Sequence, residues 1–234
     1  MSARKDILIA GGSSAIALSL TNKYRDLGFN VWTLSRASFD HSNHLQYDLI
    51  DKESLHDFKS QLDELNLYFH LVIQCSGLLH DDVNMPEKQL SSINADWLHK
   101  SLDVNVLTHV LLAQCLENHI VTKEEFKWVS LSAMVGSISD NYLGGWYSYR
   151  MTKAALNMFI RGLAIEWKRK NPNASVVAMH PGTTDSPMSS PFKVRPDKLY
   201  SPDLSANRIV KVIDSLDPSR TGLFINWDGN LINF

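Results

Sequence analysis

Short apolar runs alternate along this chain with longer segments in which apolar residues recur every three or four positions. Runs that are bounded by glycine, asparagine and other turn formers are typical of strands buried on both faces of a sheet. Runs of this kind cover residues 6–10, 31–34, 45–47, 68–73, 126–131, 175–179 and 223–225. We expect each of them to form a β-strand.

The segments between these runs have helical periodicity. They cover residues 14–27, 51–65, 102–119, 146–170 and 202–216. Asp51 is placed to cap the second of these helices. Strands separated by helix-length connections pair in parallel through right-handed crossovers. The pattern therefore predicts one α/β domain over residues 1–234, a doubly wound Rossmann-type fold with a seven-stranded, mainly parallel sheet.

Two segments without clear periodicity, 77–93 and 181–201, directly follow predicted strands. In an open parallel sheet, ligands bind beyond the carboxyl ends of the strands. We therefore expect these two loops to line the functional site, with residues 186–201 as a short lid.

Composition narrows the classes of function. Hydrophobic residues make up 44% and charged residues 21% of the 234 residues, which is typical of a globular protein rather than a disordered one. The net charge of −2, without a block of like charge, argues against nucleic-acid binding. Neither the 2 cysteines nor the histidines have metal-ligand spacing, and the apolar runs are too short for a membrane span or a signal peptide. We expect a cytoplasmic protein without a metal site or a membrane anchor.

The turn after the first apolar run is Ala10-Gly11-Gly12-Ser13-Ser14-Ala15-Ile16-Ala17. A tight turn of small residues between a strand and a helix directs backbone N–H groups toward a bound pyrophosphate. A generic strand-to-helix turn would also favour glycine and serine. The turn is therefore a candidate dinucleotide site, with a plain turn as the alternative.

The second run ends at Ser35-Arg36. NAD-binding folds carry an acid at this place, which binds the ribose diol. An arginine instead is suited to the 2′-phosphate of NADP, because its guanidinium makes charge-assisted and often bidentate bonds. Arg36 thus indicates NADP, and the alternative is a solvated surface arginine.

Tyr149 and Lys153 are four residues apart in a predicted helix, so both project from one helical face. A tyrosine can give or take a proton, and a nearby ammonium group lowers the pKa of its hydroxyl. The pair is a candidate acid/base site, and the alternative is an ordinary surface pair.

The order of these features resembles the short-chain dehydrogenase/reductase family over nearly the whole chain. The matching positions are the glycine turn, Ser35-Arg36, Asp48, Gly77, Asn105, Ser132, Tyr149 with Lys153, and Pro181-Gly182. Residues 135–150 are similar to C-factor-like and sniffer-type carbonyl reductases. The chain departs from the family at Ala15 and Ala17, where glycines are usual, and at residues 74–76, where Gln-Cys-Ser replaces Asn-Asn-Ala.

This resemblance implies a role for each matching residue. Tyr149 would protonate a carbonyl oxygen, Lys153 would assist it and bind the nicotinamide ribose, and Asn105 would order a water in a proton relay. The residues that would bind NADP(H) are Gly11, Ser13, Ser14, Ile16, Arg36, Asp48, Ser76, Gly77, Lys153, Pro181, Gly182, Thr184 and Ser186. Asp48 would bind adenine, with a helix cap as the alternative, and either Thr184 or Ser186 would contact the carboxamide. His180 has no family role, and we expect it to be structural.

The serine that assists the tyrosine in this family has no unambiguous counterpart. Alignment to Gly136 puts Ala133 at its position, one residue after Ser132. A one-residue change in the turn would bring Ser132 into the site, whereas Ser137 and Ser139 are alternatives nearer to Tyr149 in the sequence. We expect Ser132 to fill the role.

These features predict an NADP(H)-dependent oxidoreductase that reduces an aldehyde, ketone or diketone to an alcohol. Leu143, Trp146, Met188 and Phe192 are expected at the mouth of the site and favour a small-to-medium apolar substrate. The alternatives are a non-enzymatic dinucleotide-binding signalling or regulatory protein of the C-factor type, and an NAD-linked alcohol dehydrogenase that uses the same residues. The resemblance also implies a homodimer or homotetramer.

Overall fold

The computed structural model describes residues 5–234, so residues 1–4 of the predicted domain lie outside the described part of the chain. The strands of the main sheet are β1 (Asp6–Ala10), β2 (Asn30–Ser35), β3 (His44–Gln46), β4 (Phe69–Gln74), β5 (Phe126–Leu131), β6 (Ala174–His180) and β9 (Phe224–Asn226). They pair in parallel throughout, in the order β3-β2-β1-β4-β5-β6-β9. The predicted fold class, a doubly wound α/β fold with a seven-stranded sheet, is confirmed.

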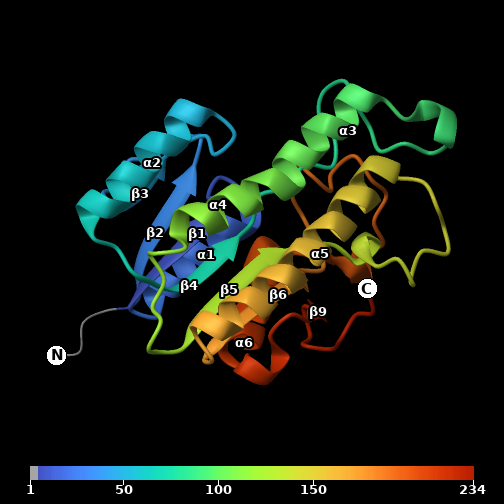
Figure 1. Ribbon diagram of the computed structural model, residues 1–234. Helices are drawn as coiled ribbons and strands as arrows, with labels where there is room; N and C mark the ends of the chain where they lie inside the picture. Colours follow the sequence, from blue (N-terminus) through green and yellow to red (C-terminus); the bar gives the residue numbers. More distant parts are fainter. Residues whose placement is uncertain (1–4) are drawn as a thin grey trace.

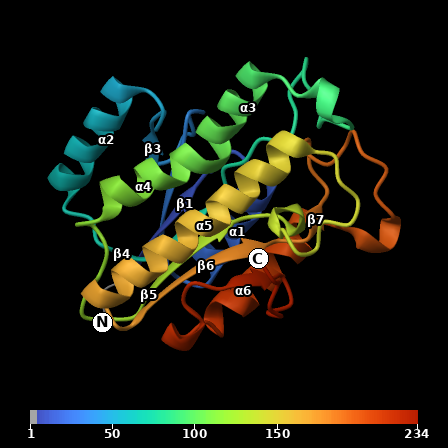
Figure 2. The same ribbon diagram turned by 45° about the vertical axis from the view of Figure 1, so that its right-hand side comes forward.

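Helices cover both faces of this sheet (Figure 1). They are α1 (Ala15–Asp26), α2 (Lys52–Leu65), α3 (Ala95–Leu102), α4 (Thr108–Leu116), α5 (Tyr147–Lys170) and α6 (Pro202–Asp214). The apolar residues of α2, α4 and α5 pack on one face, and those of α1 and α6 pack on the other. Figure 2 shows α4 and α5 side by side across their face. Because the central strands are buried on both faces, their sequences are continuous apolar runs.

Short polar residues begin several of the helices. The side chain of Ser14 accepts a hydrogen bond from the backbone N–H of Ala17 at 3.3 Å, and Asp51 accepts one from Ser54 at 2.8 Å. These bonds satisfy N–H groups that the first helical turn leaves without partners. They confirm the predicted cap at Asp51, and they place the start of α1 directly after the glycine turn.

The helical segment predicted over 102–119 differs from the structure in two ways. Helix α3 begins earlier, because the side chain of Asn94 caps it with bonds to the N–H groups of Asp96 and Trp97 at 2.8 and 3.1 Å. A π-helical turn, Asp103–Leu107, then separates α3 from α4 and carries the buried Asn105. Such wider turns occur at functional sites, where they redirect a side chain from the regular helical path.

The segment 181–201 contains a small element that its sequence does not predict. Strands β7 (Thr183–Thr184) and β8 (Leu199–Tyr200) pair in parallel and join the two ends of the lid. Arg208 on α6 supports this pair, since its guanidinium lies 4.0 Å from the ring centres of both Tyr200 and Trp227. Within residues 5–234, no helix is both long enough and apolar enough to cross a membrane.

Candidate active site

The loops that follow β1, β4, β5 and β6 meet at one edge of the sheet and enclose a cavity of about 630 Å³. Both segments expected to line a site, 77–93 and 181–201, contribute to its wall. A second cavity of about 210 Å³ adjoins it, since residues 75–77 and the glycine turn line both. The two cavities together form a groove across the carboxyl ends of the strands.

Tyr149 and Lys153 lie in the wall of the larger cavity, on the first turns of α5. Lys153 is 2% exposed, and its Nζ donates a hydrogen bond to the carbonyl oxygen of Leu131 at 2.9 Å. The same Nζ lies 5.8 Å from the centre of the Tyr149 ring. The structure therefore brings the predicted pair together at the cavity, rather than on the outer surface of the helix.

Burial dominates the electrostatics of this pair. It lowers the pKa of Lys153 to about 8, against the opposing effect of Cys75, because removal from water disfavours the ammonium. It also raises the pKa of Tyr149 above the ordinary value for tyrosine. The expected lowering of the Tyr149 pKa by Lys153 is thus not found, because the cost of desolvating a phenolate is larger. A tyrosine in this state is protonated at neutral pH and can donate its proton.

Ser132 lies in the same cavity wall and is 4% exposed. Its hydroxyl donates to Oδ1 of Asn157 at 2.7 Å. Ser137 is also buried, but its hydroxyl donates to the carbonyl oxygen of Asn233 at 2.5 Å and lies 3.3 Å from the hydroxyl of Ser139. Neither Ser137 nor Ser139 is part of the cavity wall. Of the three candidate serines, the structure places only Ser132 beside Tyr149 and Lys153.

Asn105 lies behind the cavity, where its side chain joins two elements. Its Oδ1 accepts from the N–H of Leu78 at 2.6 Å, and its Nδ2 donates to the carbonyl of Leu78 at 2.8 Å and to Oγ1 of Thr152 at 3.0 Å. The side chain thus fastens the backbone after Gly77 to α5. The water relay implied by the family resemblance remains a prediction.

The glycine turn packs tightly against the loop after β4. Gly11 has a φ of +71°, and a Cβ on it would lie 2.6 Å from the backbone nitrogen of Ser76. Only glycine fits there. The cavity wall next to this contact includes Ser13, Ser14 and the first residues of α1, Ala15 and Ile16. This arrangement can receive an anion, because the N–H groups of a helical first turn have no partners within the helix.

Arg36 and Asp48 lie at the far end of the smaller cavity. Both side chains are exposed to solvent, and Arg36 Nη1 lies 4.0 Å from a carboxylate oxygen of Asp48. The other oxygen of Asp48 accepts from the N–H of Ile50 at 3.0 Å. This bond closes a turn ahead of α2, whose cap is Asp51, so the helix-cap alternative for Asp48 is wrong. Asp48 lines the smaller cavity, and its role toward adenine stays a prediction.

The departure from the family at residues 74–76 has its own supports. The side-chain oxygen of Gln74 accepts from the N–H of Ser76 at 3.1 Å, and His109 Nε2 lies 3.3 Å from the Ser76 carbonyl oxygen. His109 Nδ1 lies 3.0 Å from the hydroxyl of Ser130, which also accepts from the indole of Trp128 at 3.0 Å. No local pattern identifies His109, because its partners lie on β5 and in the loop after β4, far from it in the sequence.

The loop after β6 supplies the remaining predicted residues. Pro181, Gly182, Thr184 and Ser186 all line the larger cavity. The hydroxyl of Thr184 already pairs with Ser205 at 2.7 Å, whereas Ser186 is only partly buried and bonds the Thr184 carbonyl at 3.3 Å. His180 lines the cavity as well, with burial lowering its pKa to about 4, and its structural role stays a prediction.

The mouth of the site is apolar, with one correction to the prediction. Trp146, Met188 and Phe192 line the cavity, but Leu143 is 92% exposed and does not. The positive φ angles of Gly144, Gly145 and Trp146 turn the chain between Leu143 and α5, so Leu143 lies outside. The Trp146 and Phe192 rings have centres 5.1 Å apart and form one wall.

Comparison with known proteins agrees with this geometry. A family model described as short chain dehydrogenase matches residues 5–196. The chain belongs to the short-chain dehydrogenase family and is an enzyme of that type.

Two relatives illustrate the range within the family. Over 236 residues, the chain is 25% identical to 1-hydroxy-2-glutathionyl-2-methyl-3-butene dehydrogenase of Rhodococcus sp. (strain AD45), covering 97% of this chain and 99% of that protein. It is 36% identical to C-signal of Myxococcus xanthus over 100 residues, which cover 42% of this chain and 55% of C-signal. The second match agrees with the predicted C-factor-like resemblance.

Solved structures share the fold at low sequence identity. The NADPH-bound carbonyl reductase from chicken fatty liver has a TM-score of 0.85 at 20% identity, with 99% of each chain covered. The carbonyl reductase Sniffer of D. melanogaster has a TM-score of 0.84 at 21% identity, covering 99% of this chain and 100% of that one. These likenesses confirm the fold, which this chain shares with a solved sniffer-type carbonyl reductase.

Replacing His109 by glutamine should reduce the acid sensitivity of the fold. Burial lowers the pKa of His109 to about 3, while an unfolded histidine has a pKa near 6.5. Below about pH 6.5 the unfolded state therefore binds a proton that the folded state excludes, and stability falls until about pH 3. Between pH 7 and about pH 5, the wild type should lose about 2 kcal/mol through His109, and His109→Gln should not. Urea unfolding at both pH values measures the difference, and equal losses would contradict it.

Proposed function

We propose that this enzyme is an NADP(H)-dependent carbonyl reductase that converts an aldehyde, ketone or diketone into an alcohol. The observation that carries the proposal is the convergence of Tyr149, Lys153 and Ser132 in the wall of one cavity, which continues into the glycine turn. A proton donor thus faces a space that can hold both a small substrate and a dinucleotide. We further expect a cytoplasmic homodimer or homotetramer.

In this proposal, an NADP(H) molecule would lie along the groove formed by the two cavities. The tight contact at Gly11 and the first turn of α1 would hold the pyrophosphate, Arg36 the 2′-phosphate, and Asp48, Ser76 and Gly77 the adenosine. Lys153, Pro181, Gly182, Thr184 and Ser186 would hold the nicotinamide half. NADPH, when bound, supplies the hydride. The chicken carbonyl reductase and a Burkholderia multivorans short-chain dehydrogenase/reductase with the same fold bind NADPH and NADP, which supports this choice.

The proton is supplied by the chain itself. Tyr149 would donate its phenolic proton to the carbonyl oxygen as the carbonyl carbon is reduced. Lys153 has three N–H donors and gives one to Leu131, so its charge and two donors remain for the tyrosinate and the cofactor ribose. The hydroxyl of Ser132 can turn from Asn157 to the substrate oxygen and stabilise the developing negative charge. The apolar wall of Trp146, Met188 and Phe192 favours an apolar carbonyl compound.

Tyr149→Phe tests the proposal directly. We expect NADPH binding to persist, while turnover falls at least about 100-fold, because a positioned acid is lost and the ring is kept. The assay follows NADPH oxidation with a panel of apolar aldehydes, ketones and diketones. Tyr142→Phe is the matched control, since Tyr142 is 86% exposed and lies outside the cavity. Turnover of Tyr149→Phe within a few-fold of the wild type would exclude Tyr149 as the acid.

Arg36→Ala tests the choice of cofactor. The variant should bind NADPH about 10- to 100-fold more weakly, because one charge-assisted contact to the 2′-phosphate is lost. Binding of NADH should change little, since NADH lacks that phosphate. Calorimetric titration with both cofactors measures the difference, and Arg169→Ala, an exposed arginine at the far end of α5, is the control. Equal weakening of both cofactors would disprove the NADP preference.

Separate alanine variants of Ser132 and Ser137 identify the assisting serine. Ser132→Ala should reduce turnover by about 10- to 1,000-fold, with NADPH affinity nearly unchanged, because one bond to the developing oxyanion is lost. Ser137→Ala should leave turnover near the wild-type value, because Ser137 contacts the C-terminal segment and not the cavity. The reverse result would assign the role to Ser137, and two fully active variants would remove the serine from the reaction.

A further inference from the structure

The first turn of α5 is held by a carboxylate from another part of the chain. Glu87, in the loop after β4, accepts a hydrogen bond from the N–H of Ser148 at 3.1 Å and another from its hydroxyl. The backbone carbonyl of Glu87 also accepts from the N–H of Trp146 at 2.5 Å. Ser148 directly precedes Tyr149, so these three bonds fix the backbone next to the proposed acid.

Helix α5 has no cap of its own. Its N-cap residue Trp146 has a φ of +52° and makes no side-chain capping bond, and its first turn contains no acidic residue. The preceding Gly145 also has a positive φ, and a Cβ there would lie 3.3 Å from the Glu87 carbonyl oxygen. The turn into α5 is thus shaped to fit against Glu87, which does the work of a capping residue across 61 positions of sequence.

The carboxylate of Glu87 is buried in the protein, which is rare for a glutamate. Glu87 is 4% exposed, and burying a carboxylate is costly unless hydrogen bonds and opposite charge compensate it. Here the compensation comes from the two groups of Ser148 and from the positive end of the α5 dipole. Both carboxyl oxygens of Glu87 are thus occupied by groups of Ser148, which an apolar side chain at position 87 could not bind.

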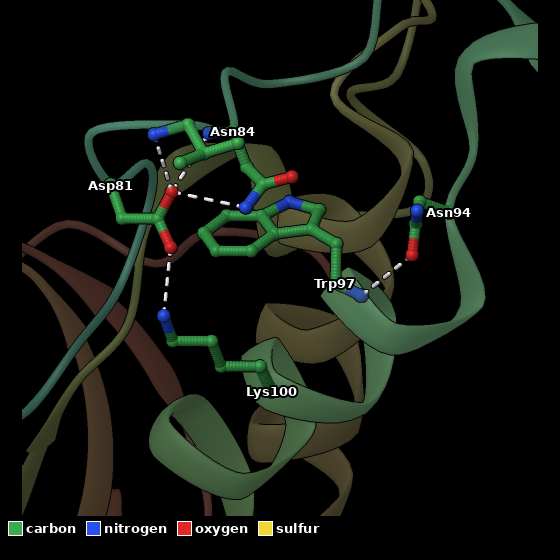
Figure 3. Close-up of polar contacts among 6 residues, drawn as sticks. Asp81, Asn84, Asn94, Trp97 and Lys100 are labelled. Atoms are coloured by element: carbon green, nitrogen blue, oxygen red, sulfur yellow. Dashed lines mark hydrogen bonds and ion pairs between the residues drawn. The ribbon is translucent and has the colours of Figure 1, made fainter.

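The loop that carries Glu87 is itself firmly attached (Figure 3). Asp81 accepts from the N–H groups of Val83 and Asn84 at 3.0 and 2.7 Å, and from Lys100 Nζ at 2.7 Å. Lys100 belongs to α3, whose start Asn94 caps. The loop is therefore tied to α3 at one point and to α5 at another, and Glu87 has a fixed support.

We propose that Glu87 is a positioning residue, which holds the first turn of α5 so that Tyr149 points at the carbonyl oxygen of the substrate. This inference rests on the proposed function of Tyr149. Glu87 acts through the backbone of Ser148 rather than through its charge on the phenol, since burial alone accounts for the raised pKa of Tyr149. Loss of Glu87 should therefore lower turnover without moving the pH profile.

Glu87→Ala and Glu87→Gln test the proposal on the best substrate of the carbonyl panel. Glu87→Ala should lower kcat about 10- to 100-fold per NADPH-binding site, because small displacements of a reacting group have effects of this size. Glu87→Gln keeps one acceptor oxygen and should lose less, about 3- to 10-fold. The NADPH Kd should stay within about 2-fold, because residues other than Glu87 line the cofactor groove.

Asp203→Asn is the matched control. Like Glu87, Asp203 is a carboxylate at the start of a helix and accepts a serine hydroxyl, from Ser19 at 2.8 Å, but α6 carries no proposed acid. The Asp203→Asn substitution should leave kcat unchanged. If kcat per binding site in Glu87→Ala stays within about 2-fold of the wild type, or falls with NADPH affinity in proportion, the proposal is overturned. An active Tyr149→Phe would instead disprove the proposed function, whatever the Glu87 variants do.

A second measurement does not depend on turnover or on a folded Glu87→Ala. In Glu87→Gln, amide hydrogen exchange in residues 147–150 should accelerate at least about 3-fold, while exchange in residues 160–170 stays unchanged. A further test returns to turnover. Ser148→Ala removes only the hydroxyl donor, so its effect on kcat should largely disappear in a Glu87→Ala background, where no acceptor remains for that hydroxyl. Unaltered exchange at the first turn, or fully additive effects of the two substitutions, would show that the contact does not position Tyr149.

Discussion

The parallel pairing of β1, β4, β5 and β6 is the constraint on which the site depends. Parallel strands run in one direction, so the loops that follow them leave from the same edge of the sheet. Gly11, Gly77, Ser132 and Pro181 each come within three residues of the end of one of these strands. Residues distant in the sequence are thereby collected without any bond between them, and α5 only has to begin at this edge to add Tyr149 and Lys153.

Collecting polar groups at the edge of a buried sheet has an energetic cost, which the neighbouring backbone and side chains offset. The ammonium of Lys153 is nearly inaccessible to water and donates to the last carbonyl of β5. The bonds from Trp128 to Ser130, His109 and Ser76 likewise form a continuous buried chain beneath the proposed adenosine site. Together with Gln74, this chain supports the backbone of Ser76, so the loop is held although the two asparagines usual in the family are absent.

Local patterns account for what could be predicted, and long-range contacts account for what could not. The bounds of β1 and β5 match the predicted runs 6–10 and 126–131, because burial on both faces makes most residues of each strand apolar. The spacing of Tyr149 and Lys153 predicted that they share one helical face, and the order of motifs along the chain indicated that this face meets the site, where both residues lie. Three features had no local signal: the contact from Glu87 to Ser148, the support of Ser76 by His109, and the outward turn at Leu143. The prediction that Lys153 lowers the pKa of Tyr149 was wrong, because the spacing reveals the nearby charge but not the burial of the Tyr149 hydroxyl.

The loop after β4 contacts Asn105, the lid and the first turn of α5, and these contacts differ in strength. At its start, Leu78 is held by the buried side chain of Asn105, and further on Glu87 is held by the buried Ser148. Between them, His80 contacts the lid through the Met188 carbonyl at 3.2 Å and the Phe192 ring. Hydrogen bonds of a partly exposed histidine to a loop exchange with water more easily than those of a buried carboxylate to a helix. The contacts of His80 with the lid are therefore easier to break than the bonds that hold the first turn of α5.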